Sequence, residues 1–217
     1  MRTGQKDPAP PAVRERIVDT ASRLFYREGI QAVGIQRLID EAGIAKASLY
    51  AHFPSKADVV AEYLTRQSAA FRDRVGRLVL DSPVPPREKT LRLFDFLADW
   101  SASTEFRGCP FQNAGAEFPA AGHPVRAVID RHRAWLREML GGLVRALGVR
   151  ETAHLAGALL VLADGAAATS ALDSSQAARQ ARWAAEHLID TAARRRRQVR
   201  PARSKRRPTG ANRRPRA

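Results

Sequence analysis

The stretch GIQAVGIQRLIDEAGIAKASLYAHFPSK, residues 29–56, contains two short helical patterns joined by a turn. The first pattern covers about residues 35–41, Gly43 supplies the turn, and the second covers about residues 46–53. Pro54 ends the second pattern, because proline lacks the N–H group that a helix interior requires. Two short helices joined by a glycine-containing turn predict a helix-turn-helix unit.

The second pattern has one apolar face and one face of small and polar residues. Leu49 and Phe53 lie four residues apart, so we expect both to anchor this helix to the scaffold. The residues left on or near the outward side are Lys46, Ala47, Ser48, Ala51 and His52. The major groove of DNA, about 12 Å wide, admits one helix. Small outward side chains allow close approach to base edges, so the sequence predicts double-stranded DNA as a partner.

Helical patterns also flank this unit. Upstream, apolar residues recur with helical spacing at Val13, Ile17, Ala21 and Leu24. Gly29 should end that first helix, because glycine adopts a positive φ without strain. Downstream, Ser55 should cap a helix that has Asp58 at its third position and runs to about residue 80.

Residues 29–56 resemble the DNA-binding motif of the TetR family of bacterial regulators. The strongest matches are Ala42-Gly43-Ile44 and the run LYAHFPSK, residues 49–56. In motif the resemblance covers roughly residues 12–60, and beyond them only the all-helical layout matches. It implies an all-α protein, with an N-terminal three-helix DNA-binding domain that contains the helix-turn-helix. A larger helical ligand-binding and dimerisation domain would follow.

The resemblance also implies a role for individual residues. Tyr50, His52 and Lys56 would contact phosphates, and Arg37 would lie near the DNA backbone. Bases would be faced by Lys46, Ala47, Ser48 and Ala51. This agrees with the general division in which phosphate contacts position a protein and base contacts specify the sequence. The alternative is that Tyr50 and His52 only pack at a tight helix junction and that Lys56 is a solvated lysine.

The sequence departs from the family pattern at three places. Ala45 stands where a serine commonly caps the reading helix, and such a cap stabilises a helix by about 0.5–2 kcal/mol. Ala47 replaces a common glycine, and Val33-Gly34 replaces a polar pair. These changes weaken local start signals and leave Lys46 and Ser48 as the main polar base-readers.

The segment DSPVPP, residues 81–86, breaks the helical pattern. Helical patterns return at about 87–103, 110–118, 125–147, 151–172 and 175–193. We therefore expect four segments along the chain. They are a flexible arm (1–11), the DNA-binding domain (12–60), an effector-binding and dimerisation domain (61–193) and a disordered basic tail (194–217).

The second half of the chain shows no catalytic set. The histidines His123, His132, His154 and His187 are scattered, without the paired spacing that a metal site needs. There is no nucleophile elbow, P-loop or dinucleotide fingerprint. We expect no enzyme activity, no metal and no cofactor. An enzyme with an incidental helix-turn-helix is the disfavoured alternative.

Aromatic side chains concentrate in the first half of this region. Singly each is usually a core residue, but as a group they could line an apolar effector cavity. The candidate pocket residues are Phe94, Trp100, Cys109, Phe111, Asn113, Glu117 and Trp135. In the run RGCPFQN, residues 107–113, a break precedes a helix that carries Asn113 and Glu117 on one face; this pattern is also similar to a subgroup of the family. Cys109 is either a small packing residue or a thiol sensor of oxidants and electrophiles, which would require a lowered pKa.

The last two helical patterns favour a homodimer. Between Ala153 and Ala171, alanines and glycines accompany several leucines, and small residues permit close helix approach. The resemblance implies that these helices pair across a two-fold axis, which would present two reading helices to two half-sites. It also implies a repressor that an unknown small-molecule effector releases from its DNA operator.

Positive charge gathers at the end of the sequence. The chain has a formal net charge of +15, and residues 194–217 hold 12 basic and no acidic side chains. Residues 1–70 hold 10 basic and 8 acidic side chains, so the total charge is a poor argument for specific DNA binding. The tail could be a solvated extension or a non-specific DNA tether. A general nucleic-acid-binding or architectural protein is therefore the second hypothesis.

The cysteine content and hydropathy predict a cytoplasmic protein. The one cysteine excludes an internal disulfide, which fits a reducing compartment. Residues 1–11 contain no apolar core of a secretory signal. The most apolar run, residues 155–163, is shorter than the roughly 20 residues of a membrane span. We expect no membrane association.

Overall fold

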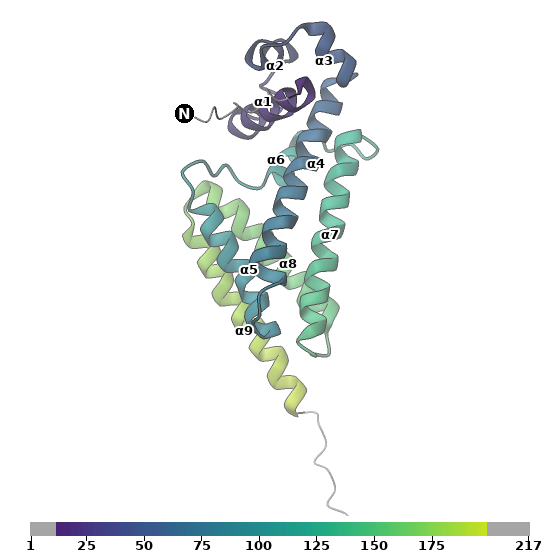
Figure 1. Cartoon of the computed structure of the whole chain (residues 1–217). Helices are drawn as coiled ribbons and strands as arrows, with labels where there is room; N and C mark the ends of the chain where they lie inside the picture. The colour runs from purple at the N-terminus through teal and green to yellow at the C-terminus, as the bar shows by residue number, and fades with distance from the viewer. Residues whose placement is uncertain (1–11, 199–217) are drawn as a thin grey trace, which may run out of the picture.

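The computed structural model describes residues 12–198, and those residues form helices and their connections without a strand. The all-α prediction is therefore confirmed. The helices are α1 (Val13–Glu28), α2 (Ile35–Ala42), α3 (Lys46–His52), α4 (Lys56–Val75), α5 (Pro86–Ser101), α6 (Pro110–Glu117), α7 (Pro124–Ala146), α8 (Thr152–Leu172) and α9 (Gln176–Gln198). Figure 1 shows α1, α2 and α3 together at one end, here called the head, and α4 running from the head into a body formed by the other helices.

The head folds around the face that the spacing of its apolar residues predicts. Ile17 and Leu24 of α1 are buried, and Gly29 ends the helix with a φ of +93°. Its N–H group donates a hydrogen bond to the carbonyl of Phe25 at 3.1 Å. The Phe25 ring then meets Tyr63 of α4 edge to face, with ring centroids 5.7 Å apart. These contacts fix α1 against the first half of α4.

Helix α4 begins with reciprocal hydrogen bonds between Ser55 and Asp58, which confirms the predicted cap. The Ser55 N–H group donates to Oδ2 of Asp58 at 2.9 Å, and the Asp58 N–H group donates to Oγ of Ser55 at 3.3 Å. Helix α3, by contrast, has Ala45 at its N-cap position and therefore lacks a side-chain cap, as the sequence predicts. The α-helical part of α4 ends at Val75 and is continued by a π-helical turn, η1 (Gly76–Leu80).

Head and body share one hydrophobic core. The buried cluster under α1, α2 and α3 includes Phe111 and Ala114 of α6 and Val125 and Ile129 of α7. Helix α4 also passes residue 60, the expected domain boundary, without interruption. Helix α4 therefore contributes buried residues to both the head and the body.

In the body, α9 is tied to α5 by ion pairs and extends further than expected. Arg87 donates hydrogen bonds to Glu186 at 2.7 Å and to Asp190 at 2.8 Å. The prediction that the disordered tail starts at residue 194 is wrong for residues 194–198, which continue α9. Arginine is a good helix former, and the first breaker is Pro201. The arm (1–11) and the rest of the tail (199–217) lie outside the described residues.

Helix α8 is apolar along most of its length, although much of it is exposed. Among the described residues it is the one helix that length and composition would allow to cross a membrane. The helix is longer than the nine-residue apolar run because its apolar character continues across single polar residues such as Asp164. Helix α8 packs against α5, α7 and α9, as the core helix of a bundle does, yet only 28% of its most apolar window is buried. The chain alone leaves much of this apolar surface uncovered.

Candidate functional site

The outward face of α3 is exposed and small, while its inward face is fixed in the core. Leu49 is fully buried and Phe53 is 4% exposed, as predicted for the two anchoring residues. Ser48 is half-buried, and the exposed side chains are Lys46, Ala47, Tyr50, Ala51 and His52. The geometry thus leaves one short helix that can approach another surface closely.

The residues expected to touch phosphates lie around this face. Tyr50 is 44% exposed and His52 is exposed, so neither is a residue that only packs at the junction. Lys56 is half-buried at the first position of α4, and this burial lowers the pKa of its ammonium group. Arg37 is exposed, but its guanidinium donates to both carboxylate oxygens of Glu28, at 2.5 and 2.9 Å. Arg37 therefore already has an acidic partner within the head.

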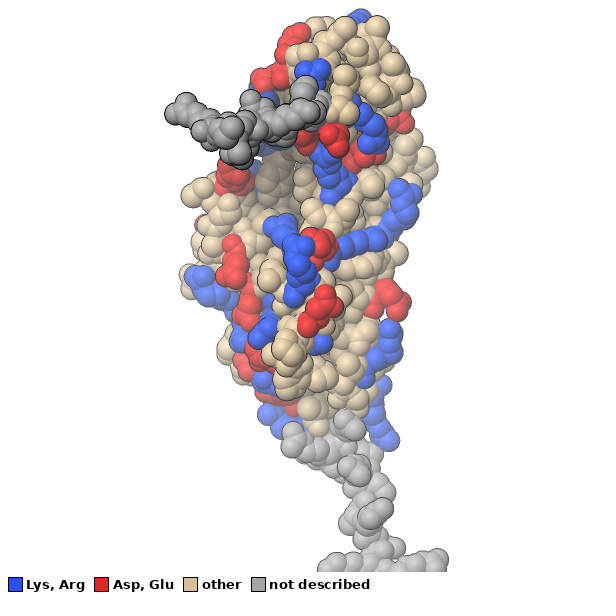
Figure 2. Space-filling model, viewed as in Figure 1, with Lys and Arg blue, Asp and Glu red and all other residues tan. Residues whose placement is uncertain are grey.

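Half of the basic side chains of residues 12–66 form ion pairs. Arg14 binds Glu62 and Arg23 binds Glu41, each at 2.8 Å, and Arg66 binds Asp19. Figure 2 shows basic and acidic side chains interspersed over the face that it presents, without one continuous basic patch. Charge alone therefore does not single out a binding face, whereas α3 is distinguished by its exposed small residues.

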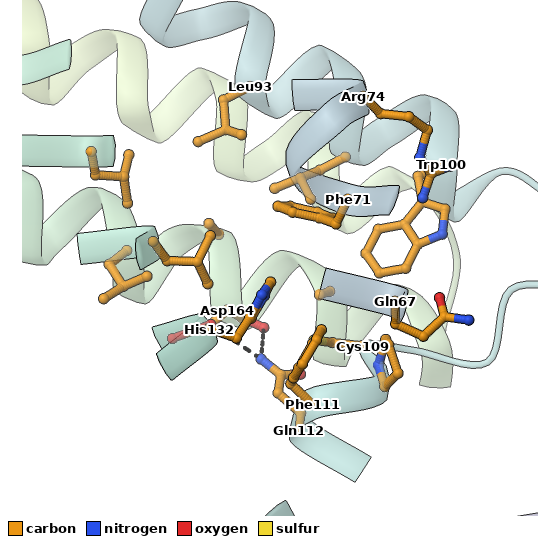
Figure 3. A pocket seen from close by; sticks show the side chains of 17 residues that line it. Gln67, Phe71, Arg74, Leu93, Trp100, Cys109, Phe111, Gln112, His132 and Asp164 are labelled. Atoms are coloured by element: carbon orange, nitrogen blue, oxygen red, sulfur yellow. Dashed lines mark hydrogen bonds between the residues drawn. The ribbon is translucent and has the colours of Figure 1, made fainter. Parts of the chain in front are cut away.

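A second candidate site is a cavity of about 60 Å³ inside the body. Its walls come from α4, α5, α6, α7 and α8 and are mostly apolar, with aromatic rings from Phe71, Trp100 and Phe111. At its polar end, Gln112 donates a hydrogen bond to the carbonyl of Asp164 at 3.1 Å (Figure 3). Arg133 donates to both carboxylate oxygens of Asp164 at 2.6 and 2.7 Å. The Asp164 carboxylate is thus already neutralised.

His132 forms one wall of this cavity and is held neutral. Its ring is 2% exposed and stacks on Phe111 with ring centroids 3.6 Å apart. The Nδ1 atom lies 2.9 Å from Oγ of Ser68. Burial, together with the positive charges of Arg72 and Arg133, lowers the pKa of His132 from 6.5 to about 4. At neutral pH the imidazole therefore carries no charge.

We expect the buried His132 to make the protein less stable in mild acid. The unfolded chain binds a proton near pH 6.5, whereas the folded chain does so only near pH 4. The free energy of unfolding should therefore fall as the pH falls between these values, by up to about 3 kcal/mol. Urea unfolding of the His132→Gln variant across this range should show a flatter dependence. The exposed His52→Gln variant serves as control; an unchanged slope in His132→Gln would contradict the assignment.

Cys109 lines the same cavity at the start of α6. The preceding Gly108 has a φ of +85°, and a Cβ atom there would lie 3.3 Å from the Cβ atom of Ala171, which explains the glycine before the cysteine. Burial raises the pKa of the Cys109 thiol, although the N–H groups of Gln112 and Phe111 oppose the shift. Burial therefore acts against the lowered pKa that the thiol-sensor hypothesis requires.

Three of the expected pocket residues line the cavity, namely Trp100, Cys109 and Phe111. The assignment of the other four is corrected. Phe94 is fully buried in the body core, and Trp135 packs beside Phe71 with Arg72 over its ring. Asn113 and Glu117 lie in a separate cleft next to α1. The cavity also contains three polar residues that were not predicted to line it, Arg74, His132 and Asp164, because polar residues at helical spacing resemble a solvated face.

Glu117 and Tyr26 join the body to the head. The Glu117 carboxylate accepts hydrogen bonds from the N–H groups of Ile30 at 3.2 Å and Gln31 at 2.7 Å, directly after α1. The Tyr26 hydroxyl donates to the carbonyl of Gly108 at 3.1 Å and accepts from the N–H group of Arg107 at 3.0 Å. Both ends of α6 are therefore connected to α1, while its first turn lines the cavity.

Comparison with known proteins finds relatives by sequence and by fold. The sequence profile of bacterial regulatory proteins of the tetR family matches residues 17–63. A crystal structure of a TetR-family transcriptional regulator from Streptomyces coelicolor is 31% identical and has a TM-score of 0.79; the match covers 83% of this chain and 96% of that one. The HTH-type transcriptional regulator LmrA of Bacillus subtilis is 27% identical over 124 residues, 56% of this chain.

A further relative matches over a shorter stretch of the chain. The HTH-type transcriptional repressor KstR2 of Mycolicibacterium smegmatis is 36% identical over 88 residues, which are 39% of this chain and 41% of the relative. The chain spans 66% of LmrA and 61% of the regulator YxaF, both of Bacillus subtilis. The similarity to these curated relatives thus covers less than two thirds of their length.

Proposed function

The chain belongs to the TetR family of bacterial regulatory proteins, and from this premise we propose that it is a sequence-specific DNA-binding repressor of transcription in the cytoplasm, rather than an enzyme. The observation that carries the proposal is the geometry of α3. Leu49 and Phe53 hold this helix in the core, while Lys46 and Ala47 stand exposed on its outward face. Such a helix fits the major groove, and the exposed Tyr50 and His52 can reach the phosphates at its edge.

Selection of bound fragments from a random pool of duplex DNA tests this proposal. It is done at physiological salt, with the full chain and with a variant that ends at residue 198. We expect both proteins to enrich the same palindromic site. A pool from which neither protein enriches any sequence would contradict the proposal and support non-specific binding by the basic tail.

We further propose that the protein acts as a homodimer through α8 and α9. Large apolar side chains are exposed on these two helices, namely Val161, Leu172, Trp183 and Leu188. An exposed apolar surface of this kind favours a protein partner. A second copy of the same face would bury it and place two copies of α3 on two half-sites, in keeping with a palindromic operator.

Effector release is the third part of the proposal. The first turn of α6 lines the cavity, and Glu117 at its last turn holds the chain after α1. Helix α4 also runs from the cavity wall at Phe71 to the head at Lys56. A ligand that enters the cavity and displaces α6 or α4 would therefore change the position of α3 and lower affinity for the operator.

We expect a Glu117→Gln variant to loosen this connection. The carboxylate accepts two N–H groups, and a neutral amide cannot accept both with equal strength, so hydrogen bonds worth about 1–3 kcal/mol are weakened. Amide hydrogen exchange at Ile30 and Gln31 should become about tenfold faster. The operator affinity should fall severalfold.

The matched control for this prediction is Glu105→Gln. It removes the same charge from an exposed acid in the segment between α5 and α6, whose side chain has no hydrogen bond or ion pair among the described residues. Exchange at Ile30 and Gln31 should then stay at the level of the unchanged protein. Equal exchange in Glu117→Gln and the control would show that Glu117 does not connect body and head.

A further inference from the structure

Arg74 is the one uncompensated charge among the described residues that line the cavity. Asp164 is bound by Arg133, and His132 is neutral at pH 7. Arg74 has no ion pair with a described residue, and its Nε atom is buried without a hydrogen-bond partner. Its guanidinium lies over the ring of Phe96, 5.5 Å from the centroid. A half-buried guanidinium with an unmet donor favours an acceptor that the protein itself does not supply.

Arg74 also lies between the cavity and a larger groove. The groove, of about 460 Å³, is lined by Arg74, Leu78, Phe96 and Trp100 and by further residues of α1, α5 and the segment that follows α5. Arg74 and Trp100 line both spaces, and Figure 3 shows them beside each other at one side of the cavity.

The two volumes limit how a ligand can be placed. Pockets for drug-sized molecules usually measure roughly 300–1,000 Å³. The inner cavity, about 60 Å³, holds only part of such a molecule, and the remainder must lie near Arg74 and Trp100 or in the groove. The inner part must be apolar, because Phe71, Leu140 and Phe111 line the cavity.

From this arrangement we infer that the effector is an amphipathic organic anion, whose apolar end enters the inner cavity and whose carboxylate binds the guanidinium of Arg74. The inference rests on the proposed effector-responsive function and adds the chemical class of the ligand. Arginine pairs with carboxylates through two parallel hydrogen bonds, and such charge-assisted bonds are about twice as strong as neutral ones. Binding would also satisfy the Nε donor.

Two acids on the groove rim would favour a cationic ligand, contrary to the anion inferred from Arg74. Asp99 and Glu105 line the groove and are both exposed, whereas Arg74 is half-buried. Exposed carboxylates are screened by water and salt, so they act on a ligand less strongly than a half-buried guanidinium does. A ligand that binds at the neck between the two spaces should therefore respond to Arg74 first. A cationic probe is therefore included in the experiment, to decide between an anionic ligand at Arg74 and a cationic ligand at the two acids.

Three matched probes test the inference with the full chain: 4-phenylbutyrate, 4-phenyl-1-butanol and 4-phenylbutylamine. They share one apolar end and differ in charge, and their binding is measured by titration calorimetry and by tryptophan fluorescence. We expect the carboxylate to bind at least about tenfold more tightly than the alcohol, and the amine to bind most weakly. In Arg74→Gln, the carboxylate and the alcohol should bind within about twofold of each other.

Two further variants serve as controls. Arg77→Gln removes the same charge from the same continuous helix, at a residue that pairs with Asp73 and lines neither space; it should keep the preference of the unchanged protein. Arg74→Lys keeps the charge without the forked geometry and should keep most of the preference. If Arg74→Gln does not fold, Arg74→Lys provides a second variant at the same position for the comparison.

Several results would overturn the inference. These are equal binding of carboxylate and alcohol, tightest binding of the amine, no binding of any probe, or an undiminished preference in Arg74→Gln. Enrichment of an operator from random DNA is measured separately on the same preparation. If an operator is enriched but the probes do not bind as expected, only the inferred ligand class is contradicted. If no operator is enriched, the proposed repressor function itself is contradicted.

Discussion

An Ala47→Glu variant is expected to lose about a hundredfold or more of the protein's affinity for its selected operator. Ala47 is exposed near the start of the outward face of α3. A carboxylate there would face the negatively charged groove and would displace close contacts with base edges. The same substitution should leave stability unchanged or slightly raised, because glutamate is a good helix former and an acid in the first turn interacts favourably with the helix dipole.

This prediction is specific because the substitution should lower the operator affinity without lowering the stability of the fold. Affinity is measured by fluorescence anisotropy on the operator that the selection yields, and stability by urea unfolding. Ala47→Gln separates the added bulk from the added charge, and Thr104→Glu adds the same charge at an exposed residue far from α3. Retained operator affinity in Ala47→Glu would mean that α3 does not enter the groove.

A Val161→Asp variant is expected to be a monomer. Val161 is 70% exposed on α8 in the single chain. In the proposed dimer its side chain would lie in an apolar interface, where an unpaired carboxylate costs several kcal/mol. Light scattering should give the mass of one chain, 23.9 kDa, instead of twice that value. The operator affinity should fall strongly, since a monomer can bind only one half-site at a time.

Leu78→Asp is the matched control for the dimer prediction. Leu78 is 55% exposed on η1, away from α8 and α9, so the substitution introduces the same charge at an apolar surface residue. Its mass in solution should equal that of the unchanged protein. A Val161→Asp variant that remains dimeric would show that the exposed face of α8 is not the interface.

The features that the sequence predicted are those decided within a few neighbouring residues. Gly29 ends α1 and Pro54 follows α3, because each residue restricts its own backbone. The Ser55–Asp58 cap joins residues three apart. Leu49 is buried because the spacing of apolar residues fixes the inward face of a short helix. The head could therefore be predicted almost completely.

The features that the sequence did not predict depend on how distant helices meet. Glu117 accepts from Gln31, 86 positions away, and no local pattern distinguishes it from a solvated acid. Phe94 lies in the core and Phe111 lies in the cavity wall. Which aromatic side chain lines the cavity depends on how α5 and α6 are rotated against α4. The position of Arg74 between the cavity and the groove depends on the packing of the whole body, so no local pattern could predict it.

The paired charges of the head have a consequence for the ions that surround DNA. A basic side chain releases condensed counterions when it neutralises a phosphate, and each such contact makes binding weaken with rising ionic strength. Arg14, Arg23 and Arg37 already hold carboxylates, so each would have to leave an acid before it could act in this way. These three arginines should therefore displace few counterions, and their own contribution to the salt dependence of DNA binding should be small.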